Sequence, residues 1–164
     1  GRLERHGFRR IYIAGHPEGH RRVADEALAQ ALRRKLAAAA ERGLEVTLLT
    51  QFCFDARPII EWLTALRASG ITSPCRVGVA GPASKASLLK FALMCGVGPS
   101  LRALQGREQL AGNMLGGETP EALLRDVAAA RSEVEELGID GVHFFTFGSL
   151  AKVATWLDEQ RTVR

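Results

Sequence analysis

The chain has 164 residues and a mass of 17.8 kDa, and 46% of its residues are hydrophobic and 24% charged. This balance is typical of one soluble globular domain and excludes disordered and collagen-like chains. No apolar run reaches the ~20 residues that a membrane span needs, so we expect no membrane partner. Cys53, Cys75 and Cys95 are odd in number and widely spaced, which indicates neither a disulfide framework nor a metal site, and favours a reducing, cytoplasmic location.

The net charge of +4 is unevenly distributed along the chain. Residues 1–35 hold nine Arg or Lys against four Asp or Glu, which gives +5, and the other 129 residues hold 13 against 14, which gives −1. The basic amino-terminal third indicates an anionic ligand. Nucleic acid is not expected, because no basic run is interleaved with the aromatic side chains that stack on bases.

Short apolar segments, bounded by turn or helix signals, predict four buried strands. They are Arg10–Ala14, Glu45–Thr50, Arg76–Ala80 and Gly141–Thr146. Helical patterns follow each of them and are predicted over 25–42, 58–69, 85–95, 119–138 and 149–160, where Gly43, Gly70, Gly96 and Gly138 provide the stop signals. In the last helix, the apolar stripe is expected to consist of Leu150, Val153, Ala154 and Leu157.

A strand followed by a helix, repeated four times, predicts parallel strands joined by right-handed crossovers, and therefore an α/β fold. We predict one domain over residues 1–164. Four strands are half the number in a (β/α)8 barrel, and an open four-stranded sheet has two unpaired edges. Ligands bind at the carboxyl ends of such strands, which selects the loops His16–His20, Gln51–Asp55, Gly81–Ser84 and Phe147–Ser149.

The first of these loops reads Gly-His-Pro-Glu-Gly-His from Gly15 to His20. Two histidines four residues apart beside a glutamate suggest zinc, but Pro17 and Gly19 oppose the helix that the HExxH arrangement requires, so no metal is expected. Two interpretations remain open. One or both histidines cap the turn through backbone hydrogen bonds, or they contact a polar ligand such as a cofactor.

The second loop places the neutral amide of Gln51 between a strand and two phenylalanines. An amide side chain offers both a donor and an acceptor, which suits a flat heterocycle with an amide or pterin edge. Phe52 and Phe54 are expected to fill the core, and Asp55 is expected to cap the following helix.

The third loop, with Lys85 at a helix start, resembles a phosphate-binding loop but lacks the Walker A spacing. In the second loop, Cys53 has no evident histidine partner that would make it a nucleophile.

Five segments occur in an order and at separations that resemble the carboxyl-terminal half of the 5,10-methylenetetrahydrofolate reductase family. They are IYIAGHPEGH (11–20), LRRKLAA (32–38), TQFCFD (50–55), GITSP (70–74) and GVHFFTF (141–147). The resemblance covers about 140 residues. It implies a (β/α)8 barrel that binds FAD at the carboxyl ends of its strands, of which this chain would form strands five to eight.

The same resemblance implies roles for individual residues. His16 stands where the family usually has a tyrosine beside the flavin, and His20 matches a histidine near the cofactor. Arg34 and Lys35 match basic positions that reach the phosphates and adenosine side of FAD. Gln51 matches the glutamine that hydrogen-bonds the folate pterin and, in the other half-reaction, the nicotinamide amide. Phe91 falls where a phenylalanine packs on the substrate.

The implied activity is that of a flavin-dependent oxidoreductase of one-carbon metabolism. NAD(P)H reduces the flavin, and the reduced flavin then reduces 5,10-methylenetetrahydrofolate to 5-methyltetrahydrofolate. The chain departs from the family at Ser87, where a second glutamine is usual, and at 146–149, where Asn-Arg is usual. It also has no counterpart of strands one to four, which carry the acidic proton donor.

Two other functions stay open from the sequence. One is a non-catalytic binding or assembly module derived from such a barrel, and the other is a different α/β enzyme that acts on a phosphorylated small molecule. Because the sheet is expected to end in unpaired edges, we predict self-association or a requirement for the missing half of the barrel.

Overall fold

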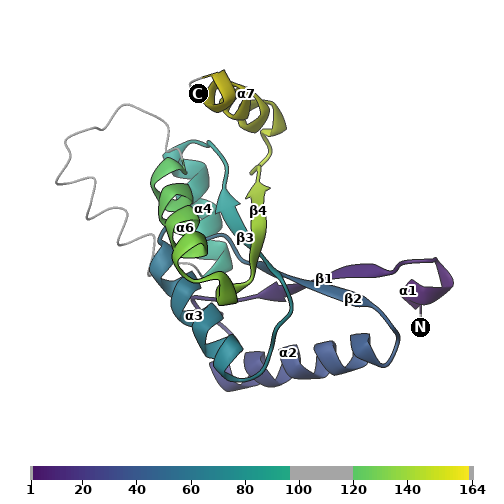
Figure 1. Ribbon diagram of the computed structural model, residues 1–164. Helices are drawn as coiled ribbons and strands as arrows, with labels where there is room; N and C mark the ends of the chain where they lie inside the picture. The colour runs from purple at the N-terminus through teal and green to yellow at the C-terminus, as the bar shows by residue number, and fades with distance from the viewer. Residues whose placement is uncertain (1, 97–119, 163–164) are drawn as a thin grey trace.

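A computed structural model describes residues 2–96 and 120–162 and contains one four-stranded parallel sheet (Figure 1). The strands are β1 (Arg10–Gly15), β2 (Glu45–Thr50), β3 (Cys75–Ala80) and β4 (Ile139–Phe145), and they lie side by side in chain order. Parallel strands that alternate with helices confirm the predicted α/β fold. The arrangement is consistent with half of a (β/α)8 barrel.

The helices follow the predicted order, with shifts of a few residues at their ends. They are α1 (Arg2–Arg5), α2 (Asp25–Ala40), α3 (Ala56–Ala68), α4 (Lys85–Cys95), α6 (Glu121–Glu133), a single 3₁₀ turn η1 (Glu135–Leu137) and α7 (Leu150–Thr162). The short α1 was not predicted. The helical pattern expected over 119–138 divides into α6 and η1, and β4 begins before the predicted Gly141. Thr119 and the glycine-rich stretch before it lie outside the described residues.

Local signals define where two of the helices begin. Asp55 is the N-cap of α3, as expected, and its carboxylate accepts a hydrogen bond from the backbone N–H of Arg57 at 3.0 Å. Ser84 caps α4 by accepting from the N–H of Ser87, and Gly96 ends that helix in the left-handed conformation at φ 81°. The loops before α3 and α4 are therefore held close to the carboxyl ends of β2 and β3.

The main hydrophobic core lies on one face of the sheet, where α2, α3 and α6 gather (Figure 1). Leu48, Val77 and Val79 point into it from the strands and are fully buried, and Ile59 and Leu63 of α3 meet them. The other face carries polar and partly exposed side chains, and Tyr12 of β1 is 57% exposed there. Parallel sheets normally have both faces covered, so this face is unusual in an isolated chain.

The stripe expected on α7 is wrong in part. Val153 is buried as expected, but the second buried residue is Trp156, whose ring lies 5.9 Å from that of Phe144. Leu150 is 72% exposed and Leu157 is 37% exposed. The helix packs on the end of β4 through a face rotated from the apolar stripe, because the large ring of Trp156 fills the space beside Phe144.

A close junction between β2 and β3 bends the sheet. These strands share only two registered pairs, whereas β1–β2 and β3–β4 each share six. Beyond the registered pairs, the hydroxyl of the fully buried Thr50 accepts a hydrogen bond from the N–H of Gly78 at 2.8 Å. A Cβ at Gly78 would clash with the Thr50 carbonyl oxygen and lie 2.8 Å from the Phe145 ring, so the approach depends on glycine.

Replacing Gly78 by alanine should therefore destabilise the fold by about 1–3 kcal/mol, because the new methyl group meets backbone that cannot move aside. Urea unfolding followed by circular dichroism measures this loss. Gly141→Ala is the matched control, since Gly141 lies on the adjacent strand and a Cβ added there would have no neighbouring atom within 4 Å. Equal free energies of unfolding for the two variants would contradict the requirement for glycine at position 78.

Over the described ranges 2–96 and 120–162, none of the helices is both long and apolar enough to span a bilayer.

Candidate functional site

The loop after β1 forms a tight turn that holds the two predicted histidines near each other. The N–H of Gly19, at φ 74°, donates to the carbonyl oxygen of His16 at 3.0 Å. The rings of His16 and His20 meet edge to face with their centroids 5.8 Å apart. Nδ1 of His20 accepts from the N–H of Arg22 at 3.2 Å, which is the backbone-capping contact that the sequence left open.

Burial and positive neighbours act together on His16. The pKa of His16 is lowered below the ordinary 6.5, mainly because its ring is half-buried. The positive charges of His20 and Lys35 lower this pKa further. The structure thus brings Lys35, from the middle of α2, within electrostatic range of the histidine pair. Positive groups that disfavour one another's charge define a place where an anion would be stabilised.

A pocket of about 560 Å³ opens beside this loop, between the end of β1 and the helices α2 and α3. Its polar side chains are those of His16, Glu18, Asp25, Arg33 and Ser69, and its apolar ones include Leu28, Leu32 and Trp62. A Cβ at Gly15 would meet the Trp62 ring, with Cζ2 at 2.9 Å, so glycine allows α3 to approach the strand end. Its volume lies in the range of small-molecule sites.

Gln51 lies at the end of β2, next to the loop after β1. Its N–H donates to the carbonyl oxygen of Gly15 at 2.8 Å, which extends the β1–β2 pairing by one residue. Its half-buried side chain folds back, and Oε1 accepts from the N–H of Phe52 at 3.2 Å. That contact holds the carboxamide at the strand end through its oxygen, so the amide NH₂ group is the end that can donate to a ligand.

Glu18 connects the two loops, a contact that the sequence did not predict. The buried Cys53 thiol hydrogen-bonds with the Glu18 side chain, and Cys53 Sγ lies 3.6 Å from the Gln51 carbonyl oxygen. Burial first, and then the negative charges of Glu18 and Asp55, raise the pKa of the Cys53 thiol. A protonated, buried thiol is not a nucleophile, so Cys53 serves as a packing and hydrogen-bonding group.

An aromatic cluster forms the other half of the site, over the carboxyl ends of β2, β3 and β4. Phe52 is 1% exposed and stands at its centre, with the Phe147 ring 5.0 Å away and the Phe145 ring 5.8 Å away. Phe91 of α4 packs on Phe147 at 4.7 Å, so the predicted Phe91 belongs to this cluster. Phe52 fills the core as expected, and the half-buried Phe54 lies at its edge.

Phe147 adopts a backbone conformation that is rare for a large side chain. Its φ of 48° makes it the one non-glycine residue with positive φ among those described. Backbone strain of this kind concentrates at functional positions, since only a surrounding structure that over-determines the residue maintains it. Sequence patterns do not reveal this feature, because it results from the packing of Phe147 between Phe52 and Phe91.

The predicted residues thus fall into two adjoining groups, joined by the Gln51–Phe52 peptide. His16, His20 and Lys35 form the polar group, and Phe91 belongs to the aromatic one. Arg34 is exposed on α2, and the basic residue that lines the pocket is Arg33, which the sequence analysis did not select. Of the residues predicted to form the site, only His16 lines that pocket.

In the described part of the chain, no three His, Cys, Asp or Glu side chains gather in a way that could hold a metal ion.

Comparison with models of protein families found no family model that matches this chain.

The lowered pKa of His16 predicts how stability depends on pH. Because the unfolded chain takes up this proton near pH 6.5 and the folded chain only at lower pH, stability is full above 6.5 and falls as the pH drops through that value. His16→Asn should therefore show a smaller decrease in Tm than the parent between neutral pH and about pH 5.5. Identical decreases would contradict the assignment, and an NMR titration of the His16 ring protons tests the same pKa directly.

Proposed function

We propose that this chain supplies one wall of the active site of a flavin-dependent oxidoreductase that reduces 5,10-methylenetetrahydrofolate with NAD(P)H in the cytoplasm. The observation that supports it is the meeting of a cationic group and an aromatic group at the carboxyl edge of one parallel sheet. FAD combines an anionic diphosphate with a flat apolar ring system, so it requires both kinds of surface in one place. Three free cysteines are in keeping with the cytoplasmic location.

The residues at this edge fit FAD in charge and in shape. Lys35, and Arg33 from the pocket lining, would hold the diphosphate, and the His16 ring, which its lowered pKa keeps neutral near pH 7, would contribute a hydrogen bond. The cluster around Phe91 and Phe147 would provide an apolar wall for a flat ring. When bound, FAD supplies the two-electron redox chemistry, and the chain's own residues supply binding and orientation.

Gln51 would orient the flat substrate. Its carboxamide can accept from and donate to the amide edge of a pterin or a nicotinamide, and its Oε1 is already held by the N–H of Phe52. Fixing the reacting ring in this way is a proximity effect. The Glu18 carboxyl group contacts the thiol of Cys53, which in turn lies 3.6 Å from the backbone carbonyl oxygen of Gln51.

Flavin binding tests the proposal directly. A titration of the full chain with FAD should show saturable binding, and the change in the flavin fluorescence measures it. Lys35→Gln should weaken FAD binding roughly tenfold through loss of a nearby positive charge. Arg34→Gln is the matched control, because Arg34 is the neighbouring exposed cation and is not among the charges that act on His16. A correctly folded chain that shows no saturable FAD binding would overturn the proposal.

In an active form that contains the whole barrel, Gln51→Ala should lower turnover of methylenetetrahydrofolate by about 10²-fold while changing the Tm little, because the side chain's internal hydrogen bond reaches only to the next residue. Anaerobic reduction of bound flavin by NAD(P)H, followed by its reoxidation by the folate, measures each half-reaction. Gln30→Ala, on the exposed surface of α2, controls for loss of a glutamine. Parallel losses of Tm and turnover would show that Gln51 is a structural residue.

One observation favours a second candidate function. Outside the core, the sheet has an uncovered polar face and two outer strands, which suits a non-catalytic assembly module. A chain that associates but neither binds FAD nor is reduced by NAD(P)H would support this module over the oxidoreductase.

A further inference from the structure

The two outer strands of the sheet offer matching edges. In the described residues, β1 pairs only with β2 and β4 only with β3, so each has one edge of backbone N–H and C=O groups without a strand partner. Both strands point the same way and have nearly equal lengths, six and seven residues. An edge of this kind is a template for another strand.

Opposite charges flank the amino ends of these two strands. Near β1 lie the basic residues Arg2, Arg5, Arg9 and Arg10, all exposed. Near β4 lie the acidic residues Glu133, Glu135, Glu136 and Asp140, also exposed. If β4 of one chain pairs in parallel with β1 of another, the amino ends meet and the basic group faces the acidic group.

The charges on the uncovered face would then alternate from strand to strand. Within the chain, Arg10 of β1 pairs with Glu45 of β2 at 2.6 Å, and Arg76 of β3 pairs with Asp140 of β4 at 3.2 Å. Moving along the sheet, the signs are positive, negative, positive, negative. A second copy placed beside β4 continues the series, because its first strand begins with Arg10.

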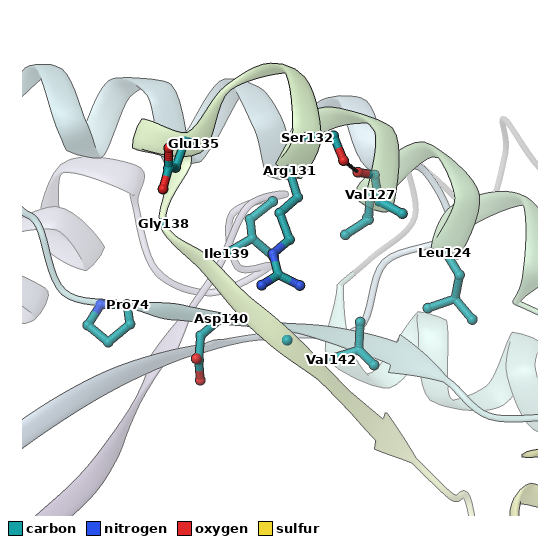
Figure 2. A pocket seen from close by; sticks show the side chains of 12 residues that line it. Pro74, Leu124, Val127, Arg131, Ser132, Glu135, Gly138, Ile139, Asp140 and Val142 are labelled. Carbon is teal, nitrogen blue, oxygen red and sulfur yellow. Dashed lines mark hydrogen bonds between the residues drawn. The ribbon is translucent and has the colours of Figure 1, made fainter.

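Apolar surface also remains at both edges. Phe8 and Tyr12 at β1 are 55% and 57% exposed, and Leu150 and Leu157 of α7 are exposed beyond β4. Beside β4, a groove of about 810 Å³ runs along α6. Figure 2 shows Arg131 reaching from α6 toward β4, with Leu124 and Val142 lining the groove further along. The groove is therefore apolar along part of its length and open to the side chains of an added element.

We propose that two copies of this chain associate as a closed dimer, in which β4 of each copy pairs in parallel with β1 of the other. Two four-stranded sheets give the eight strands of a (β/α)8 barrel, and closure leaves no free edge. The barrel axis is then the two-fold axis of the dimer. The second copy covers the polar face and supplies the wall opposite His16, Gln51 and Phe91. This association does not depend on the proposed redox function.

The test uses the full chain and two charge-reversed variants. The parent should have twice the mass of 17.8 kDa by light scattering. Arg2→Glu, Arg5→Glu and Arg9→Glu together make the β1 end acidic, and Glu133→Lys, Glu135→Lys and Glu136→Lys together make the β4 end basic. Each variant alone places like charges at both contacts and should dissociate at least about tenfold more readily. Mixing the two should restore the dimer, because both variants together again offer a contact that joins opposite charges.

Glu26→Lys, Glu61→Lys and Glu121→Lys together, on the exposed surfaces of α2, α3 and α6, control for the change in net charge and should leave the dimer unchanged. Circular dichroism establishes that each variant is folded, and recovery on mixing is independent evidence of folding. A parent chain that stays monomeric would overturn the proposal, and the free edges of β1 and β4 would then be candidates for pairing with a different protein. Open oligomers of increasing size, or a dimer that both reversals leave intact, would overturn it as well. None of these readouts involves FAD, so a failure here is distinct from a failure of the proposed function.

Discussion

The contact between Thr50 and Gly78 is the constraint on which the rest of the structure depends. The Thr50 hydroxyl is the one buried polar side chain in the core of the described residues, and it accepts from the N–H of Gly78 at the point where regular β2–β3 pairing has ended. An unpaired hydroxyl or N–H at this depth would destabilise the fold, so each group requires the other. The strands can come this close because residue 78 has no side chain. Because all four strands are parallel, the loops that follow them lie at the same end of the sheet.

The candidate site has two chemically different halves because the loops that form it differ in composition. The loop after β1 is short and rich in glycine and histidine, and it turns toward α2, where Lys35 adds positive charge. The loops after β2 and β4 contribute phenylalanines that pack across β3 onto α4. Gln51 belongs to both, since its backbone pairs with Gly15 and its side chain accepts from Phe52. A ligand with a charged end and a flat end would match both halves at once.

The basic amino-terminal third divides into two separate regions in three dimensions. Arg9 and Arg10 lie at the amino end of β1, whereas Arg33 lines the pocket at its carboxyl end and Lys35 acts on His16 in the loop that follows. The two ends of a six-residue strand lie roughly 16 Å apart, so one anionic ligand does not account for both. The first group lies at the amino end of the outer strand β1, and the second lies around the pocket and the loop after β1. The basic amino-terminal third of the sequence therefore forms two separate basic groups in the folded chain.

The sequence by itself determined the strand and helix order, because hydrophobic runs, glycine stops and caps such as Asp55 act within a few residues. It also placed His16 and Gln51 at the carboxyl edge, since that follows from the strand order, whereas Phe91 was named only through the family resemblance. Only the tertiary structure decided that Trp156 is buried in place of Leu157, that Glu18 meets Cys53, and that Arg33 lines the pocket while Arg34 does not. These outcomes depend on how a helix is rotated and how a loop folds over its neighbour. Such choices are set by the volumes and charges of residues distant in the chain, which no local pattern contains.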